Sequence, residues 1–406
     1  MILTAQTNQK PRRRIRVWQI VLLVILVLII ALGATVGILW HNELATAFSL
    51  RKVMGANDAH HDGSVYRMDV SGDYYFDEFL AQGGASSDAE LIGFITSKIT
   101  KGLLSMGLNA PEIGCSAFTA TTESGDRVFG RNYDFSRTNT CVVYTNPGNG
   151  RHASWSTVDL AFIGIERDSD VNGIMDYISC LAAPFVPLDG INDAGVSCGI
   201  FMTYQGDDDS VTATNQMTDK PDITSTTMLR MILDYASSVE EAVALVSAYD
   251  LHDSATTSFH YMVADATGRS AILEWVSNGT DATDTDGSAR HLNVIYNDAD
   301  PLSGATDWQC ITNFIITPDY YTDEADMLGY DRYQFLRDAL TTSGGIVADD
   351  EAAMTLLSGV GRRSWNNDDS NGITVHSAVY NLTDRTMIWV ANEHYGEEAY
   401  TLTFGF

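Results

Sequence analysis

The chain has 406 residues, of which 53 are acidic and 24 basic, so its formal net charge is −29. Such an acidic surface repels nucleic acid and anionic lipid, which argues against a DNA- or RNA-binding role. The five cysteines are an odd number. In an oxidising environment four of them can pair and leave one thiol free, or none pairs, because the pairing cannot be read from the sequence.

The N-terminal part contains an uncharged apolar segment, residues 17–40, which as a helix is about 36 Å long and spans a membrane core of about 30 Å. Five basic residues stand just before it, within 10–16. The positive-inside rule therefore predicts a cytoplasmic tail over 1–16 and an extracytoplasmic remainder. A cleaved signal peptide, cut at the Ala-Thr-Ala of 45–47, is the alternative. Its apolar core is usually shorter, so we favour an uncleaved single-pass anchor.

The segment 41–114 is predicted to be a tether followed by a helical pre-segment. Residues 41–65 are polar and are expected to be the tether. Apolar residues then recur at helical spacing over 87–105, and Ser87 with Glu90 three positions later resembles a capping box. We therefore expect a packed helix over 87–105.

Beyond this helix the apolar pattern changes to a period of two. Residues 116–135 predict two strands around a turn at 123–126. The further elements expected are strands over 156–165, 195–204, 259–265 and 270–276, helices over 226–236, 239–251, 331–342 and 348–360, and a closing hairpin over 376–392. Paired strands mixed with helices indicate an α+β, layered architecture rather than a regular βαβ winding.

Cys115 stands in the stretch "GCSAFTATTESGDRVFGRNYD" of residues 114–134. If the Gly114–Cys115 bond is cut, Cys115 carries a thiol and a free α-amine on one carbon. The reference pKa of an α-amine is about 8, which suits a general base, so one residue can be both nucleophile and base. Arg131 would lie beside Cys115 in a hairpin and favour the thiolate, and Asp134 could hold the amine or the guanidinium. The alternative is a buried structural cysteine followed by a surface Arg–Asp pair.

The spacing of Cys115, Arg131 and Asp134 resembles the start of the mature chain in the choloylglycine hydrolase superfamily of linear amide C–N hydrolases. Its members include bile salt hydrolases, penicillin V acylases, acid ceramidase and N-acylethanolamine acid amidase. In these enzymes arginine follows the cysteine nucleophile by sixteen residues and aspartate by nineteen. The resemblance implies that these three residues are catalytic.

Four later stretches resemble the same family in the same order. "PLDGINDAGVSCGIF" at 187–201 is similar to a motif that would include Asn192, for which a turn role is the alternative. "CITNFIITPD" would make Asn313 a donor to the oxyanion, and "GYDRYQFL" would make Arg332 the second active-site arginine. The segment 375–389 resembles the closing hairpin. One departure is the Phe-Met-Thr-Tyr of 201–204, where bacterial relatives place an Asn or Tyr, so that role is left unassigned.

The resemblance implies a four-layer αββα N-terminal nucleophile hydrolase domain over 115–406, exposed by self-cleavage between Gly114 and Cys115. The implied activity is hydrolysis of an N-acyl amide without a cofactor. An acyltransferase using the same thioester, or an inactive surface protein that only binds, is the alternative. The amide itself remains open among bile conjugates, penicillins, acyl homoserine lactones and lipid amides. The oligomeric state is not predicted.

A weaker pattern is the acidic loop over 168–176, whose D-x-D-x-N-G order resembles the start of a calcium loop. Its twelfth position is Ser179 rather than Glu, so an EF-hand is not expected and an acidic turn is the main interpretation. The calcium ligands it would supply are Asp168, Asp170, Asn172 and Asp176.

Overall fold

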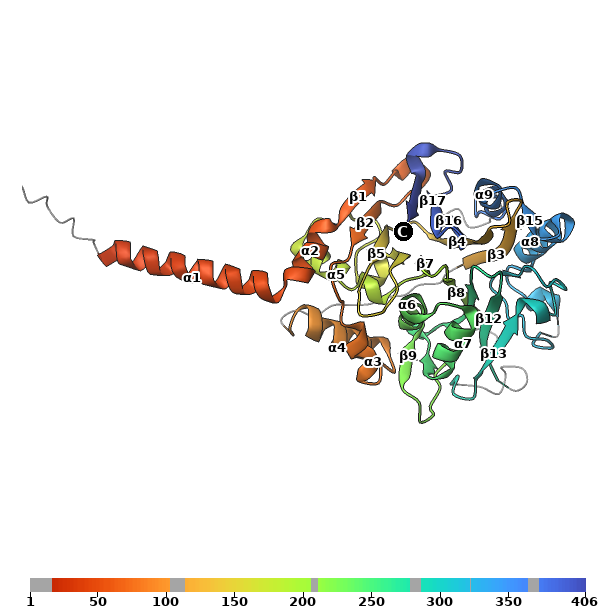
Figure 1. The fold of residues 1–406 in the computed structure, drawn as a ribbon, viewed down its shortest axis with the longest axis horizontal. Coiled ribbons are helices and arrows are strands. Elements are labelled where there is room, and N and C mark those ends of the chain that lie inside the picture. Colours follow the sequence, from red (N-terminus) through yellow and green to blue (C-terminus); the bar gives the residue numbers. More distant parts are fainter. Residues whose placement is uncertain (1–16, 103–113, 206–210, 278–285, 322, 364–371) are drawn as a thin grey trace, which may run out of the picture.

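The computed structural model describes residues 17–102, 114–205, 211–277, 286–321, 323–363 and 372–406. Helix α1 (Val17–Leu39) projects away from the rest of the molecule, and none of its residues is buried (Figure 1). It is the one helix among these described residues that is long and apolar enough to cross a membrane. Helix α2 (His41–Ser49) follows directly and joins it to the body.

Two large sheets form the body. The nine-stranded sheet has the order β1, β2, β5, β6, β7, β8, β11, β12, β13. These strands are β1 (Arg51–Met54), β2 (Val65–Asp69), β5 (Thr140–Thr145), β6 (Ser154–Asp159), β7 (Asp189–Asn192), β8 (Ser197–Thr203), β11 (Ser258–Ala264), β12 (Ser270–Val276) and β13 (His291–Tyr296). β2 pairs with β5 in parallel, and the other neighbours are antiparallel.

The second sheet has the order β14, β3, β4, β16, β17, β18, with β15 also paired to β3. Its strands are β14 (Cys310–Ile311), β3 (Gly114–Thr122), β4 (Arg127–Ser136), β15 (Ile346–Val347), β16 (Gly372–Asn381), β17 (Thr386–Ala391) and β18 (Thr401–Gly405). A separate pair is formed by β9 (Asp222–Thr224) and β10 (Asp250–His252). The predicted hairpins at the start of the domain and at its end are thus confirmed.

The layers follow the order helix, sheet, sheet, helix. Helices α6 (Ser225–Tyr235) and α7 (Val239–Ser247) pack on the nine-stranded sheet, while α8 (Tyr330–Ser343) and α9 (Asp350–Ser358) pack on the other. The two sheets meet face to face, with β3 against β8. Because β3, β4 and β8 are covered on both faces, nearly all of their residues are buried. This is the αββα arrangement that the family resemblance implies.

The expectation of a tether over 41–65 is wrong. These residues form α2, β1, the short 3-10 helix Asp58–His60 and the start of β2. Thr46 is buried in α2, and its hydroxyl accepts the backbone N–H of Ser71 at 2.9 Å. Hydrogen bonds between side-chain hydroxyls and the main chain satisfy the buried polar groups of this segment. A segment poor in apolar residues can therefore still pack on the sheet.

Two predicted elements end earlier than expected. The strand expected over 156–165 stops at Asp159, whose carboxylate accepts the N–H of Ala161 at 2.8 Å and begins a 3-10 turn, Leu160–Ile163. The helix expected over 239–251 stops at Ser247, because β10 begins at Asp250 and pairs with β9. In both cases a side-chain cap or a tertiary strand pairing overrides the local apolar pattern.

The pre-segment packs on the domain through helices α3 (Phe76–Ala81) and α4 (Asp88–Ile99). Ser87 caps α4 as predicted, because its Oγ accepts the N–H of Glu90 at 3.3 Å. The reciprocal bond of the predicted capping box is wrong, since the Glu90 carboxylate accepts the N–H of Ser86 at 2.9 Å. α4 ends at Ile99, earlier than expected: residues 100–102 form a bend and a turn, and 103–105 lie outside the described residues. Helix α5 (Ile174–Cys180) lies near α2.

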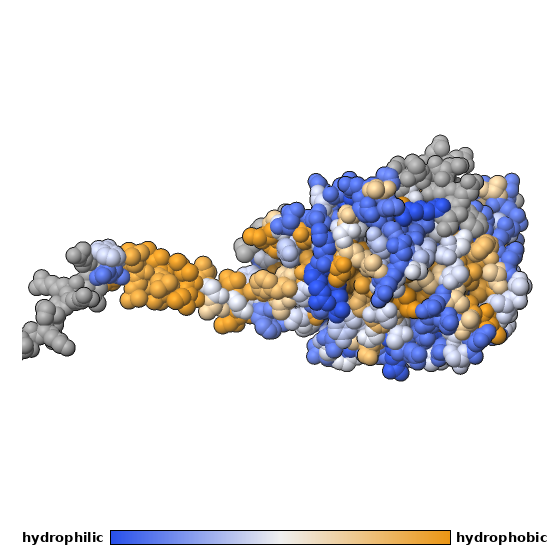
Figure 2. Space-filling view, turned by 90° about the horizontal axis from the view of Figure 1, so that it is seen from above, coloured by the Kyte–Doolittle hydropathy of each residue, from blue (hydrophilic) through white to orange (hydrophobic). Residues whose placement is uncertain are grey.

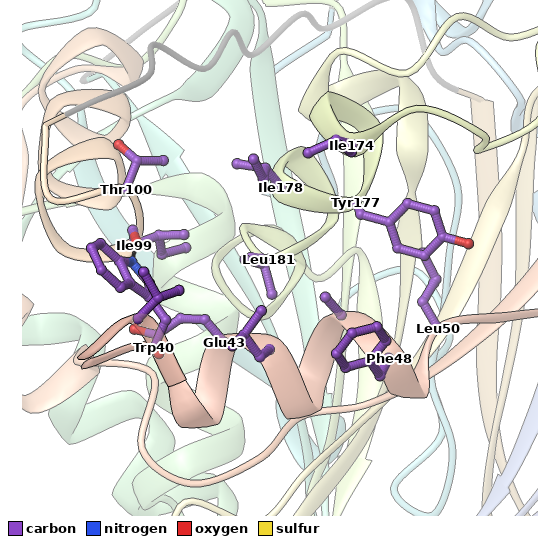
Figure 3. Close-up of a pocket in the computed structure, with 13 residues that line it drawn as sticks. Trp40, Glu43, Phe48, Leu50, Ile99, Thr100, Ile174, Tyr177, Ile178 and Leu181 are labelled. Carbon is purple, nitrogen blue, oxygen red and sulfur yellow. Dashed lines mark hydrogen bonds between the residues drawn. The ribbon is translucent and has the colours of Figure 1, made fainter. Parts of the chain in front are cut away.

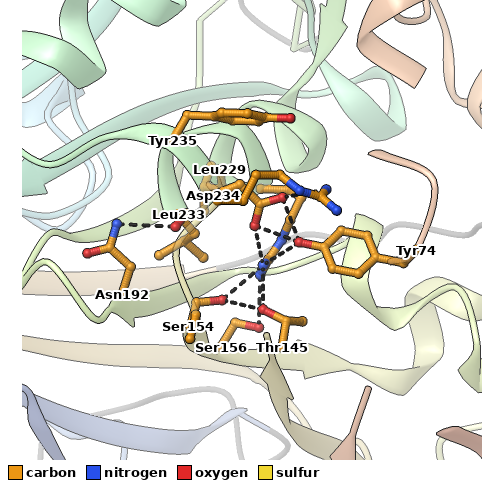
Figure 4. Close-up of polar contacts among 12 residues, drawn as sticks. Tyr74, Thr145, Ser154, Ser156, Asn192, Leu229, Leu233, Asp234 and Tyr235 are labelled. Atoms are coloured by element: carbon orange, nitrogen blue, oxygen red, sulfur yellow. Dashed lines mark hydrogen bonds and ion pairs between the residues drawn. The ribbon is translucent and has the colours of Figure 1, made fainter. Parts of the chain in front are cut away.

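A buried polar cluster also joins the pre-segment to the domain (Figure 4). The hydroxyl of Tyr74 lies 2.6 Å from both carboxylate oxygens of Asp234 on α6. Arg230 donates to Asp234 at 3.0 Å, to Ser154 at 2.9 Å and to Thr145 at 3.1 Å. All of these side chains are buried or nearly so, and an ion pair in such a place is costly to break.

Candidate active site

Cys115 is the second residue of β3 and is completely buried. β3 and β4 pair antiparallel so that Cys115 lies opposite Tyr133 and Ala117 lies opposite Arg131. Side chains two residues apart on a strand share a face, which brings Arg131 to the face of Cys115. The Nη2 atom of Arg131 lies 3.3 Å from the Cys115 sulfur. The hairpin expected from the sequence therefore brings the two side chains into contact.

Arg131 is held by partners from the nine-stranded sheet. It donates to the carbonyl oxygens of Leu188 at 2.9 Å and Ile200 at 2.6 Å, and it forms an ion pair with Asp189. Both charged side chains of this pair are fully buried. Its Nη2 thus contacts both the thiol and the Ile200 carbonyl, while its Nη1 contacts the Leu188 carbonyl and Asp189.

Asp189 is a residue that the sequence analysis missed. Its carboxylate also accepts Nε2 of His376 at 2.8 Å and the hydroxyl of Tyr380 at 2.5 Å. Asp189 lies in the same "PLDGIN" stretch that resembles the family motif, three positions before Asn192. An aspartate flanked by apolar residues at the start of a buried strand was the signal, because a buried carboxylate requires a charged or hydrogen-bonding partner.

Asp134 pairs with a different arginine from the one considered in the sequence analysis. Its Oδ2 lies 2.9 Å from Nη1 of Arg332, and its Oδ1 accepts the hydroxyl of Thr374 at 2.7 Å. Side chains three positions apart on a strand point to opposite faces, which separates Asp134 from Arg131. The pairing of Asp134 with the Arg131 guanidinium is therefore wrong, and the carboxylate serves Arg332 instead.

Arg332 and Asn313 complete the cluster around the backbone of Cys115. Arg332, on α8, donates to the Cys115 carbonyl oxygen at 3.0 Å and to Oδ1 of Asn313 at 2.7 Å. The same Asn313 oxygen accepts the Cys115 backbone N–H at 3.1 Å, while its Nδ2 donates to the Met202 carbonyl at 2.8 Å. The five residues singled out from the sequence thus form one connected, buried group.

The loop that carries Asn313 is braced by a second buried pair. Glu274 accepts the N–H groups of Ile316 at 2.7 Å and Thr317 at 2.9 Å, and it lies 3.1 Å from Nδ1 of His260. Nε2 of His260 lies 2.9 Å from the Thr312 carbonyl oxygen. Glu274 and His260 were not singled out from the sequence, since nothing local marks two neighbouring strands as supports for a loop far along the chain.

The protein shifts the pKa values of Cys115 and Asp189 in opposite directions. Burial raises the pKa of the Cys115 thiol to about 11, although the charge of Arg131 opposes this. Burial by itself also raises the pKa of Asp189, but Arg131 and His376 outweigh it and hold that pKa well below its usual value. In the uncut chain the carboxylate is therefore ionised and the thiol is protonated at neutral pH.

Asn192 bonds to the end of α6 rather than to this cluster, and Figure 4 shows its side chain directed toward Leu233. Its Nδ2 donates to the carbonyl oxygens of Leu233 at 3.1 Å and Ala236 at 2.8 Å at the end of α6. Its Oδ1 accepts the N–H groups of Ala194 and Val196. This is the turn role that was the alternative for Asn192. The side chain also supplies donors to carbonyl oxygens at the end of α6, which have no partner within the helix.

The carboxylates of the acidic loop over 168–176 bond to separate partners and do not form a shared cation site. Asp170 pairs with Lys52 at 2.7 Å, and Asp176 accepts the N–H groups of Asn172 and Gly173 at the start of α5. Within the described ranges, no group of three or more His, Cys, Asp or Glu side chains is arranged to hold a metal ion. All five cysteines are buried and free of disulfides.

The mixed α+β fold of two facing sheets, with Cys115 at the start of a central strand, is that of the N-terminal nucleophile hydrolases. Residues 115–286 match the family of linear amide C–N hydrolases, choloylglycine hydrolase family. The match covers this part of the chain and begins at Cys115. The chain is thus a hydrolase that acts on linear amides.

Solved structures give a more distant comparison. A conjugated bile acid hydrolase variant from Clostridium perfringens is 16% identical, with 72% of this chain and 92% of that chain covered and a TM-score of 0.48. Penicillin V acylase from Agrobacterium tumefaciens is 15% identical, covering 68% and 83%, with a TM-score of 0.40. An N-acylethanolamine-hydrolysing acid amidase ortholog from Caenorhabditis elegans is 16% identical, covering 66% and 93%, with a TM-score of 0.38. No curated protein matches the sequence. The family assignment rests on the match over 115–286.

Proposed function

We propose that this protein hydrolyses an N-acyl amide with Cys115 as its nucleophile, after the chain cuts itself between Gly114 and Cys115. The observation that carries the proposal is the set of contacts on one residue. The Cys115 sulfur lies 3.3 Å from Arg131, its N–H 3.1 Å from Asn313 and its carbonyl oxygen 3.0 Å from Arg332. A buried structural cysteine needs partners for its backbone but no arginine at its sulfur.

Self-cleavage follows from ordinary thiol chemistry. The Cys115 sulfur attacks the Gly114 carbonyl carbon, a C–S bond forms, and the Gly114–Cys115 C–N bond breaks as its nitrogen takes up a proton. Water then hydrolyses the thioester, leaving a carboxylate on Gly114 and a free amine on Cys115. Asn313 accepts the N–H of the bond that breaks, which supports a role in orienting it.

Turnover of the substrate repeats the same sequence of steps. The Cys115 thiolate attacks the amide carbonyl, the α-amine protonates the leaving amine, and the α-amine then activates the water that clears the thioester. Asn313 has a second N–H on Nδ2 beyond the one given to Met202, and this N–H would stabilise the oxyanion. Arg131 favours the thiolate, while Asp134 and Arg332 hold the Cys115 backbone.

We also propose that α1 is an uncleaved membrane anchor with the catalytic domain outside the cytoplasm. The Ala-Thr-Ala of 45–47, the candidate signal-peptide site, lies within α2, where Thr46 is buried and bonded to Ser71. Removal of the residues up to 47 would take most of α2 from the folded body. This packing supports an anchor rather than a signal peptide.

The experiment is intact-mass analysis with N-terminal sequencing on the full-length chain and its Cys115→Ala variant. The proposal predicts a fragment beginning Cys-Ser-Ala-Phe in the parent chain and a single uncut chain in the variant. Cleaved parent protein is then assayed on N-acyl amides with and without an acceptor amine, which separates hydrolysis from acyl transfer. A cleaved and active Cys115→Ala chain would refute the proposal.

A further inference from the structure

The end of α1 opens onto an apolar groove that the amidase site does not include (Figure 3). The groove has a volume of about 580 Å³ and lies between α2, the end of α4 and α5. Side chains from all three helices point into it, and those that matter here are Trp40, Leu44, Phe48, Ile99, Ile178 and Leu181.

The walls of the groove suit hydrocarbon rather than a polar ligand. Its one acidic lining residue within the described ranges is Glu43, and that carboxylate is engaged by the hydroxyl of Tyr75 at 2.6 Å and by Lys101 at 3.8 Å. Most of the remaining wall is aliphatic or aromatic. A wide apolar groove of this kind binds a ligand through apolar burial.

The rim of the groove exposes large apolar side chains to an unusual degree. Phe48 on α2 is 85% exposed, and Ile174 on α5 is 81% exposed. The two helices contact each other, so these residues form one continuous face. Exposed apolar patches that are contiguous mark an interaction site more often than single exposed residues do.

The position of this face identifies its partner. Val36 and Trp40, at the end of the apolar helix, belong to the groove wall, and Trp40 Nε1 donates to the Ile99 carbonyl at 2.8 Å. Figure 2 shows apolar surface on α1 and at the end of the body to which α1 is joined. Tryptophan at the end of a membrane span lies at the level of the headgroups, so the groove lies there too.

We propose that α2 and α5 lie against the outer leaflet and that the groove binds phospholipid acyl chains from it. The inference rests on the proposal that α1 is an uncleaved anchor. A second copy of the chain or a protein partner is disfavoured as the occupant, because anything that covers this face must reach it at the membrane surface. Lipid is already present there at high local concentration.

The test uses the full-length chain reconstituted in phosphatidylcholine vesicles that contain a phosphatidylcholine with a photoactivatable diazirine in its acyl chain. Cross-linked residues are located by tandem mass spectrometry. We expect cross-links on α2 and α5, around Phe48, Ile174 and Ile178, in addition to those on α1. Cross-links confined to α1, as expected if a second copy of the chain or another protein covers α2 and α5, would overturn the proposal.

Two matched variants make the test specific. Ile174→Asp places a charge on the rim at the first residue of α5, where an acidic side chain favours the helix. It is expected to lower cross-linking on α5 at least fivefold. Met217, which is 74% exposed and lies outside the groove, is the control, and Met217→Asp is expected to change nothing. Equal cross-linking in both variants contradicts the proposal. No turnover enters this readout, so an inactive protein does not affect it.

Discussion

The guanidinium of Arg332 donates a hydrogen bond to the backbone carbonyl oxygen of Cys115 at 3.0 Å. The same nitrogen lies 2.9 Å from Asp134 on the neighbouring strand. The backbone at the proposed cleavage site is therefore held by a residue 217 positions later in the chain, on an outer helix. This geometry exists only after the helix layer has docked, so we expect self-cleavage to follow folding rather than accompany synthesis.

Replacing Asn313 by Ala is expected to lower kcat on a linear amide by about 100- to 1000-fold, because it removes one donor to the oxyanion. Asn192 is the matched control, since it is also buried but bonds to the end of α6. Asn192→Ala is expected to lower the melting temperature with little effect on kcat. The measurement is steady-state kinetics with thermal unfolding of both variants. Similar kcat losses in the two would remove Asn313 from the oxyanion site.

The uncut chain is expected to show slow, pH-dependent alkylation at Cys115. A pKa of about 11 leaves about one thiol in ten thousand ionised at pH 7, so the rate of reaction with iodoacetamide should rise about tenfold per pH unit up to pH 10. The tryptic peptide 102–127 spans the Gly114–Cys115 bond and comes only from uncut chains. Mass spectrometry measures the alkylated fraction of this peptide over time, which gives the rate of alkylation at Cys115. A rate that is flat with pH would contradict the protonated thiol.

Asp189→Asn is expected to destabilise the fold by about 3–5 kcal/mol, because it leaves Arg131 charged and buried without its carboxylate. The pKa of Asp189 is held below its ordinary value near 3.9, so its contribution is fully present above about pH 4 and is lost as the pH falls further. Denaturant unfolding between pH 3 and pH 7 measures both effects. The loss of stability on acidification should be smaller in Asp189→Asn than in the parent chain. An equal slope in the two would contradict the assignment.

Glu274→Gln is expected to lower kcat by up to about 100-fold through misplacement of the loop that carries Asn313. The variant keeps the volume of the side chain but replaces one of the two carboxylate oxygens, which accept the N–H groups of Ile316 and Thr317, by an NH2 donor. KM should change much less than kcat, because Glu274 does not touch the substrate. Asp265, which is buried and accepts the Val239 N–H at 2.8 Å, is the control. Asp265→Asn should affect stability and leave kcat near that of the parent chain.

Tyr74→Phe is expected to weaken the hold between the two chains after cleavage. A hydrogen bond to a buried carboxylate contributes about 1.5–3 kcal/mol, and the bond from Tyr74 to Asp234 joins the pre-segment to the domain. If α1 anchors the pre-segment, urea washes of vesicles should release the catalytic chain at a lower concentration in this variant. Tyr75→Phe is the control, because its bond to Glu43 lies within the pre-segment. Equal release from both variants would show that Tyr74 does not join the chains.

The sequence by itself determined the apolar helix at the start and the hairpin around Cys115, which are properties of local periodicity and spacing. The alternation over 116–135 sets both strands and, with the turn at 123–126, the register that brings Arg131 to the Cys115 sulfur. The family spacing then directed attention to Asn313 and Arg332, and both lie on the Cys115 backbone.

Only the tertiary structure decided which charges pair and which segments pack. Arg131 pairs with Asp189 of the facing sheet rather than with Asp134 of its own strand. Side chains three positions apart on a strand point to opposite faces, so Asp134 pairs with Arg332 instead. Residues 41–65 pack on the body because β2 pairs in parallel with β5, where Val65 lies opposite Thr140, 75 positions later in the chain. Parallel pairing and buried ion pairs join distant parts of the chain, and no local pattern encodes them.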